Sequence, residues 1–68
     1  MENKELKKLR VDFGVSQKEV AQALGMSIST YSLIESGKRR GSAVSWKKIK
    51  EYFKIKDEDM WRIQNPQE

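Results

Sequence analysis

Apolar residues recur along the chain at intervals of three and four, and no window shows the strict alternation that marks a half-buried strand. Near the N-terminus such a run lies between Asn3, a good N-cap residue, and Gly14, which can end a helix in the left-handed conformation. The pattern predicts a helix over about 4–13, whose apolar stripe is formed by Leu6, Leu9 and Phe13.

Two short helices and a turn are expected next. Ser16 and Glu19 have the spacing of a capping box, in which the hydroxyl and the carboxylate each accept a free amide of the first helical turn. A helix over 17–24 is therefore expected, and Gly25 interrupts it. The following apolar segment predicts a helix over 28–36, with a glycine directly after it.

The last third of the chain predicts a polar loop and two more helices. Residues 38–42 contain no apolar side chain and form the loop, and an amphipathic helix is expected over 43–53. Its apolar face consists of Ile49 and Phe53 with either Val44 or Trp46. Ile55 anchors the connection to a short fifth helix that Asp57 caps, that carries Met60 and Trp61, and that ends at Asn65-Pro66.

Five helices without strands define an all-α fold, and the composition limits how it is stabilised. The 68 residues include no cysteine and no histidine, which excludes a disulfide framework and a thiolate or imidazole zinc site. A chain of this length has room for one domain, expected over 1–68, with a frayed tail at 64–68. It has no signal-peptide pattern and no apolar run of bilayer length, so we expect a cytoplasmic protein without membrane contact, metal or cofactor.

Positive charge is concentrated in one part of the chain. The formal net charge is +4, from 14 lysines and arginines against 10 acidic residues. Between residues 38 and 56 the only acid is Glu51, whereas acidic residues 57–59 follow at once. This stretch is either a binding surface for a polyanion or a lysine-rich, solvated helix face.

Residues 17–36 behave as one unit. Two short helices joined by a tight turn pack at a steep angle only where certain positions are small and others apolar. Ala21 is small where the next helix must come close, and Gly25 lies where the chain reverses. Apolar contacts on both sides of the turn come from Val20, Leu24, Met26, Tyr31 and Ile34.

The stretch from Gln17 to Lys38, which contains Gln-Lys-Glu-Val-Ala-Gln-Ala-Leu-Gly and ends in Ile-Glu-Ser-Gly-Lys, resembles the helix-turn-helix of the phage Cro and repressor family. The flanking segments Leu6-Lys-Lys-Leu-Arg10 and 42–55 are similar to the neighbouring helices of that family, so nearly the whole chain is covered. The resemblance implies a compact five-helix, lambda-repressor-like DNA-binding domain. The run Gly37-Lys-Arg-Arg-Gly-Ser, with a tryptophan soon after, resembles regulators from phages and mobile elements of Gram-positive bacteria.

In that family the helix corresponding to 28–36 lies in the major groove of DNA. With Tyr31 and Ile34 toward the core, helical rotation directs the candidate base-reading residues outward and leaves Ser27 and Thr30 nearer the buried side. The outward residues are Ile28, Ser29, Ser32 and Leu33. Family members often have long polar residues where this chain has Ile28 and Leu33, so the two are either thymine-methyl contacts or a patch that binds a protein partner.

Phosphate contacts need only amides, hydroxyls and cations in suitable places. The resemblance implies a phosphate contact by Gln17. The other candidates are Ser27, Thr30, Lys38, Arg39, Arg40 and Ser42. The alternatives are helix capping for Gln17 and Ser27, and a solvated loop for the basic run.

Other conspicuous residues are better explained by structure. The resemblance suggests that Arg10 pairs with Glu35 across the domain. Aromatic and apolar residues at helical spacing are usually core, and here they are Trp46, Ile49, Phe53, Ile55 and Met60. Trp61 either covers this core or lies in a dimer contact.

The sequence thus predicts a regulator, of repressor type, that binds a symmetric operator in double-stranded DNA as a homodimer. The alternative is a protein-binding module, such as an antitoxin or anti-repressor, that uses Ile28, Leu33 and Trp61 as anchors. An enzyme with a small-molecule substrate is not expected, because the chain lacks histidine and cysteine and has little room for a substrate cleft.

Overall fold

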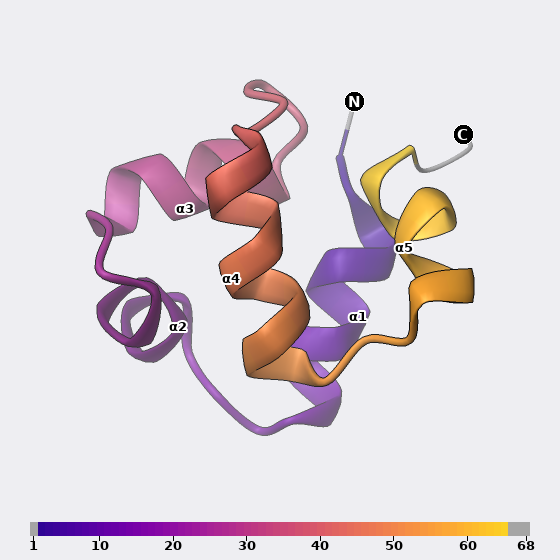
Figure 1. Cartoon of the computed structure of the whole chain (residues 1–68). Helices are drawn as coiled ribbons and strands as arrows, with labels where there is room; N and C mark the ends of the chain where they lie inside the picture. Colours follow the sequence, from indigo (N-terminus) through magenta and orange to yellow (C-terminus); the bar gives the residue numbers. More distant parts are fainter. Residues whose placement is uncertain (1, 66–68) are drawn as a thin grey trace.

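A computed structural model describes residues 2–65, which form five α-helices and no β-strand. The helices are α1 (Lys4–Asp12), α2 (Gln17–Leu24), α3 (Ile28–Glu35), α4 (Ala43–Phe53) and α5 (Asp57–Gln64) (Figure 1). This arrangement confirms the expected all-α, five-helix fold. Gln64 is the last residue of α5, and residues 66–68 of the expected frayed tail lie outside the described residues.

The predicted helix starts are confirmed by their caps. Asn3 Oδ1 accepts the amide of Leu6 at 3.0 Å. Ser16 and Glu19 form the complete capping box, with both hydrogen bonds at 3.1 Å. Two helix ends fall one residue earlier than predicted, because the last expected residue is the C-cap: Phe13 for α1 and Ser36 for α3.

The start of α5 differs from the prediction. Lys56 is the N-cap residue and makes no side-chain capping bond, while Asp57 is the first helical residue. The Asp57 carboxylate instead forms an ion pair with Lys50 of α4. A first-turn carboxylate still interacts favourably with the helix dipole, so it contributes to α5 without capping it.

The core draws on all five helices. Its buried members are Leu6, Val20, Ala21, Leu24, Tyr31, Ile34, Trp46, Ile49, Phe53, Ile55 and Ile63. Met60 packs against this cluster and is partly buried, so the expected core of α4 and α5 is largely confirmed. No helix within residues 2–65 combines the length and apolar character needed to cross a bilayer.

Three apolar side chains lie farther outside than the spacing suggested. Phe13 is 47% exposed and packs edge-on against Phe53, with ring centroids 4.9 Å apart. Val44 is 63% exposed and Trp46 is buried, which decides between these two positions on α4. Trp61 is 68% exposed, so the interpretation that it covers the core is wrong.

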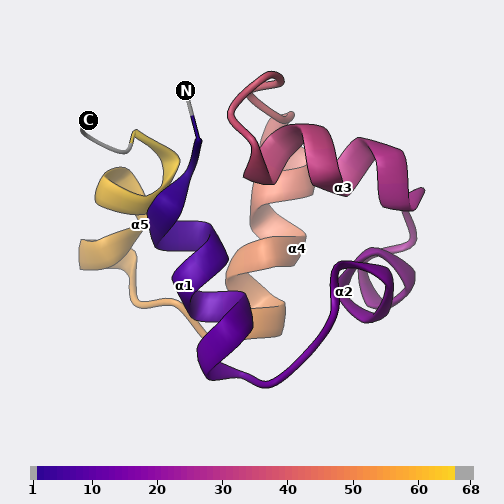
Figure 2. The ribbon, with the colours of Figure 1, turned by 180° about the vertical axis from the view of Figure 1, so that it is seen from behind.

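Polar contacts join the first and last helices, which lie side by side in the view from behind (Figure 2). The Asn3 side-chain amide donates to the carbonyl of Ile63 at 2.8 Å. Arg62 of α5 forms an ion pair with Glu5 of α1 at 2.6 Å. The N-cap of α1 is therefore also an anchor for α5.

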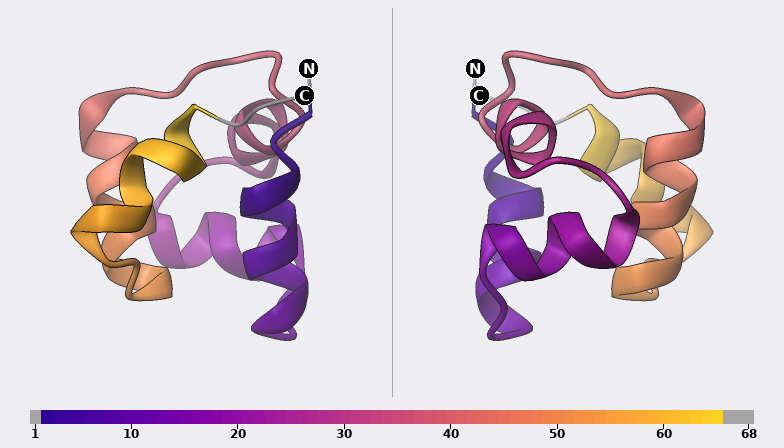
Figure 3. Two further views of the ribbon diagram at one scale, coloured as in Figure 1. Left: turned by 90° about the vertical axis from the view of Figure 1, so that its right-hand side faces the viewer. Right: turned by 90° about the vertical axis from the view of Figure 1, so that its left-hand side faces the viewer.

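The α2–α3 unit has the geometry that residues 17–36 predicted. Viewed along α3, α2 runs across the picture, so the two helices cross steeply (Figure 3). Ala21 is fully buried, and Gly25 has φ +70° at the turn. A Cβ on Gly25 would meet no neighbouring atom within 4 Å, so glycine is favoured there by backbone conformation and not by lack of space.

Candidate nucleic-acid interface

One face of α3 is buried and the other is open. Tyr31, Ile34 and Glu35 are buried against the domain. Ile28 is 45% exposed and Ser29 is exposed, while Ser32 is half-buried. The first five residues of α3 therefore present a small surface with the side chains of Ile28, Ser29 and, in part, Ser32.

Leu33 is less accessible than helical rotation suggested, since it is half-buried. Its carbonyl accepts the amides of Lys38 at 3.0 Å and Arg39 at 3.1 Å, as well as the hydroxyl of Ser36 at 3.1 Å. The chain after α3 folds back over the last turn of the helix, and that turn is partly covered for this reason.

The hydroxyls at the start of α3 are used in capping. Ser27 Oγ accepts the Thr30 amide at 3.1 Å and donates to Thr30 Oγ1 at 2.8 Å. At the start of α4, Ser42 Oγ likewise accepts the Ser45 amide at 3.1 Å. The remaining free amides of these first turns still face solvent and can bind an anion.

Gln17 is not the cap of its helix, because Ser16 has that role. Instead, Gln17 borders a shallow surface depression together with Ser32 of α3 and its C-cap Ser36. Within residues 2–65 its side chain makes no hydrogen bond to another residue. A candidate phosphate contact and a candidate base contact thus lie next to each other, although they come from different helices.

Arg10 and Glu35 form a two-bond ion pair beneath α3. The Arg10 Nε–Glu35 Oε2 distance is 2.9 Å and the Nη2–Oε1 distance is 3.1 Å, and a third guanidinium nitrogen donates to the carbonyl of Val15. Hydrogen bonding to Glu35 raises the pKa of Arg10 against the opposing effect of burial. The pair joins α1 to the last residue of α3, so it helps to set the direction of α3.

Tyr31 lies against this pair. Its hydroxyl is buried and has no hydrogen-bond partner within residues 2–65. Burial raises the pKa of the Tyr31 phenol, and the nearby Glu35 carboxylate raises it further, so this hydroxyl stays protonated.

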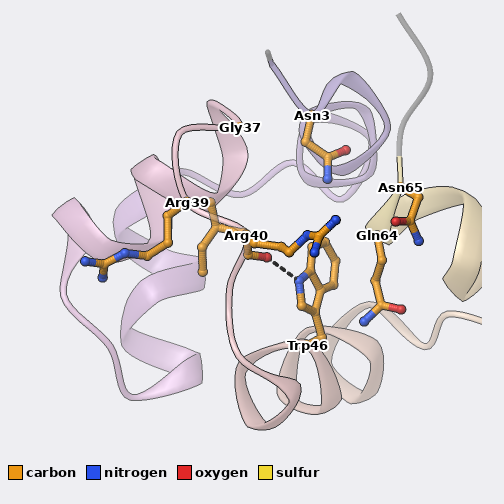
Figure 4. Close-up of a pocket in the computed structure, with 8 residues that line it drawn as sticks. Asn3, Gly37, Arg39, Arg40, Trp46, Gln64 and Asn65 are labelled. Carbon is orange, nitrogen blue, oxygen red and sulfur yellow. Dashed lines mark hydrogen bonds between the residues drawn. The ribbon is translucent and has the colours of Figure 1, made fainter.

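The basic loop between α3 and α4 is held by a tryptophan. Trp46 Nε1 donates to the carbonyl of Arg40 at 2.7 Å (Figure 4). Arg39 and Arg40 both line a cleft whose far wall is Asn3 and α5; the Arg40 side chain extends over Trp46, and the Arg39 side chain points to the other side of the loop. Residues 38–40 are all exposed, and the side chains of Arg39 and Arg40 point in different directions.

Sequence reasoning missed two contacts that shape this surface: the Trp46 bond to Arg40 and the Asn3 bond to Ile63. Both link side chains to backbone carbonyls, and neither a residue type nor a spacing signals such a partner. Within the described residues no cluster of three acidic side chains could hold a metal ion.

The fold and this surface define a helix-turn-helix domain, the class to which many DNA-binding regulators belong. The sequence profile described as Helix-turn-helix matches residues 6–60, so the chain belongs to that family, of the Cro and repressor type. It is similar to YqaF of Bacillus subtilis (strain 168), an uncharacterized HTH-type transcriptional regulator, with 43% identity over 51 residues. That alignment covers 75% of this chain and 67% of YqaF. No solved structure matches.

Proposed function

We propose that this chain is a transcriptional regulator that binds specific sequences of double-stranded DNA, with α3 lying in the major groove. The observation that carries the proposal is the accessibility of α3: its first turn is open although the opposite face anchors it firmly in the core. A major groove about 12 Å wide admits such a helix.

The base-reading residues in this proposal are Ile28, Ser29 and Ser32, with Leu33 at the edge because it is half-buried. Serine hydroxyls donate to or accept from several bases, and an isoleucine can lie against a thymine methyl group. Ile28 therefore favours A·T pairs at one position of each half-site.

Phosphate contacts surround this surface. Gln17 adds a side-chain amide beside Ser32, and Ser27, Thr30 and Ser42 lie in first turns whose free amides can bind phosphate. Lys38, Arg39 and Arg40 add positive charge in the loop after α3. Arg10 and Glu35 set the direction of the helix and do not touch DNA.

The regulator acts as a homodimer of repressor type on an operator of the kind found in phages and mobile elements. Two copies of α3 about one helical turn apart match a symmetric operator. The similarity to a regulator from a Gram-positive bacterium supports this interpretation. The function is non-enzymatic and belongs in the cytoplasm, where the DNA is.

Selection of bound sequences from a random oligonucleotide pool tests the proposal, with sedimentation of the free protein beside it. We expect an enriched palindrome with A·T pairs at the Ile28 position. A folded protein that enriches no site, at any salt concentration, contradicts the proposal and favours the protein-binding module. The observation that favours this second function is the exposure of Trp61, which is 68% exposed and could contact a protein partner.

The salt dependence of binding tests the phosphate contacts. Lys38→Ala with Arg39→Ala should lower the slope of log K against log salt by about 1.8, since each phosphate contributes about 0.9. The control is Lys54→Ala with Lys56→Ala, which removes the same charge beyond the other end of α4. Equal slopes for the two double variants would contradict a role for the loop.

A further inference from the structure

We infer that Trp46 is a positioning residue for DNA binding: its indole N–H holds the loop over residues 37–41 so that the loop cations meet the phosphate backbone. This inference rests on the proposed function. Trp46 is 4% exposed and lies too deep to touch DNA itself, so any effect on binding acts through the loop.

The loop is anchored at both ends. At its start, the Leu33 carbonyl of α3 accepts the amides of Lys38 and Arg39. At its end, the Arg40 carbonyl accepts the Trp46 N–H at 2.7 Å, the shortest of the three bonds. Between these anchors three consecutive cationic residues have little freedom to move away as a segment.

Gly41 makes the second anchor possible. It has φ +86°, and a Cβ built on it would lie 3.0 Å from Trp46 Nε1 and 3.4 Å from Ile34 Cδ1. The backbone at Gly41 must pass directly over the indole to bring the Arg40 carbonyl onto the N–H. Glycine is therefore favoured here both by conformation and by space, in contrast to Gly25, where no atom is near.

A mobile loop would lose part of its binding free energy in becoming ordered on DNA. Because one hydrogen bond to a buried indole fixes the backbone between two anchors, the backbone that carries Lys38 and Arg39 is already ordered before DNA binds. The same bond holds Arg40 on the other side of the loop, against the cleft that Trp46 and Asn3 line. The Arg39 side chain points to the opposite side of the loop, so the held backbone presents its arginines in two directions.

The first test measures the loop in the free protein. Trypsin cleaves after lysine and arginine, so cleavage after residues 38–40 reports opening of this segment. Trp46→Phe keeps an aromatic ring but removes the N–H, and should raise the rate of cleavage there about fivefold, the effect of losing one hydrogen bond. Phe53→Leu is the control, because it reduces the core from the same helix without touching the loop. Equal cleavage in the two variants overturns the inference.

The second test measures DNA binding. Trp46→Phe should weaken binding about tenfold and lower the salt slope by about one, as if about one phosphate contact were lost. In the background of Lys38→Ala with Arg39→Ala, the same substitution should have little further effect, whereas Phe53→Leu should act equally in both backgrounds. A salt slope unchanged by Trp46→Phe, or strict additivity, overturns the inference.

Gly41→Ala leaves the indole in place but adds a Cβ that would lie 3.0 Å from Trp46 Nε1. It should therefore also raise trypsin cleavage of the loop and weaken DNA binding. The outcomes separate the two proposals. Wild-type protein that binds no DNA contradicts the proposed function, and the trypsin result then still decides whether Trp46 holds the loop. If DNA binding depends on Lys38 and Arg39 but its affinity is unchanged by Trp46→Phe and by Gly41→Ala, only the positioning role is contradicted.

Discussion

Tyr31 carries a buried hydroxyl that the fold does not use. Since a buried polar group without a partner is costly, Tyr31→Phe should leave the free energy of unfolding at pH 7 unchanged or raise it by up to about 1 kcal/mol. Denaturation in urea measures this. A loss above about 2 kcal/mol would mean that the hydroxyl donates a bond that stabilises the native state, with the Glu35 carboxylate as a candidate acceptor.

The same residue predicts how stability changes at alkaline pH. The pKa of Tyr31 is raised in the folded state, so the unfolded chain loses this proton first. The contribution of Tyr31 is fully present below pH ~10 and decreases by about 1.4 kcal/mol per pH unit above it. Urea denaturation from about pH 9 to about pH 11.5, a range that spans the ordinary phenol pKa, should show a steeper loss for wild type than for Tyr31→Phe. The two proteins differ only in this hydroxyl, so parallel curves would contradict the raised pKa.

The Arg10–Glu35 pair should respond differently to the loss of one partner and to the loss of both, because its charges are buried. The two side chains are only 15% and 4% exposed, and removing one partner leaves the other charge buried. Arg10→Met should destabilise the protein by about 3 kcal/mol, whereas Arg10→Met with Glu35→Leu should cost about 1 kcal/mol. Urea denaturation of both variants decides. Equal losses of stability in the two variants would show that Arg10 stabilises the fold mainly through its hydrogen bond to the Val15 carbonyl.

At the scale of the helix, one side chain fixes two helix ends. Asn3 caps α1 through Leu6 and anchors the end of α5 through Ile63. Serine also caps helices but is too short to reach Ile63, so Asn3→Ser should loosen α5 alone, while Asn3→Ala should loosen both helices.

Hydrogen exchange distinguishes these effects. We expect faster exchange of the last α5 amides in both variants, and faster exchange at the start of α1 only in Asn3→Ala. The alanine variant should also lose about 1 kcal/mol more stability than the serine variant. Unchanged α5 protection in Asn3→Ser would contradict the bridging role of Asn3.

The helices themselves were largely predictable. Their caps and periodicity are local, so the capping box at Ser16 and the turn at Gly25 could be recognised from sequence alone. Asp57 was expected to cap α5, but it is the first helical residue and its carboxylate forms an ion pair with Lys50 of the preceding helix. The competing partner is seven residues away, beyond the reach of a capping pattern.

For the whole molecule, the exposed tryptophan of α5 tests the proposed dimer. Trp61 is 68% exposed, so Trp61→Ala should change the free energy of unfolding by less than about 0.5 kcal/mol. If it lies in the contact between two copies, binding to a palindromic operator should weaken while binding to a single half-site stays the same.

Val44→Ala is the matched control, since Val44 is similarly exposed but lies on α4. Val44→Ala should leave the affinity for the palindromic operator and the affinity for the single half-site unchanged. If Trp61→Ala binds the palindrome with wild-type affinity, Trp61 does not lie in the dimer contact. The proposed DNA-binding surface of α3 does not depend on that outcome.

By itself the amino-acid sequence determined the five helices, the caps at Asn3 and Ser16 and the α2–α3 unit, because helical periodicity and capping depend on residues within a few positions of one another. Only the tertiary structure decided that Phe13, Val44 and Trp61 lie outside, that Gln17 lies beside Ser32, and that Trp46 holds the basic loop. Those outcomes depend on which helix faces cover each other and on which backbone carbonyls come within reach, and contacts between distant parts of the chain leave no regular interval in its sequence.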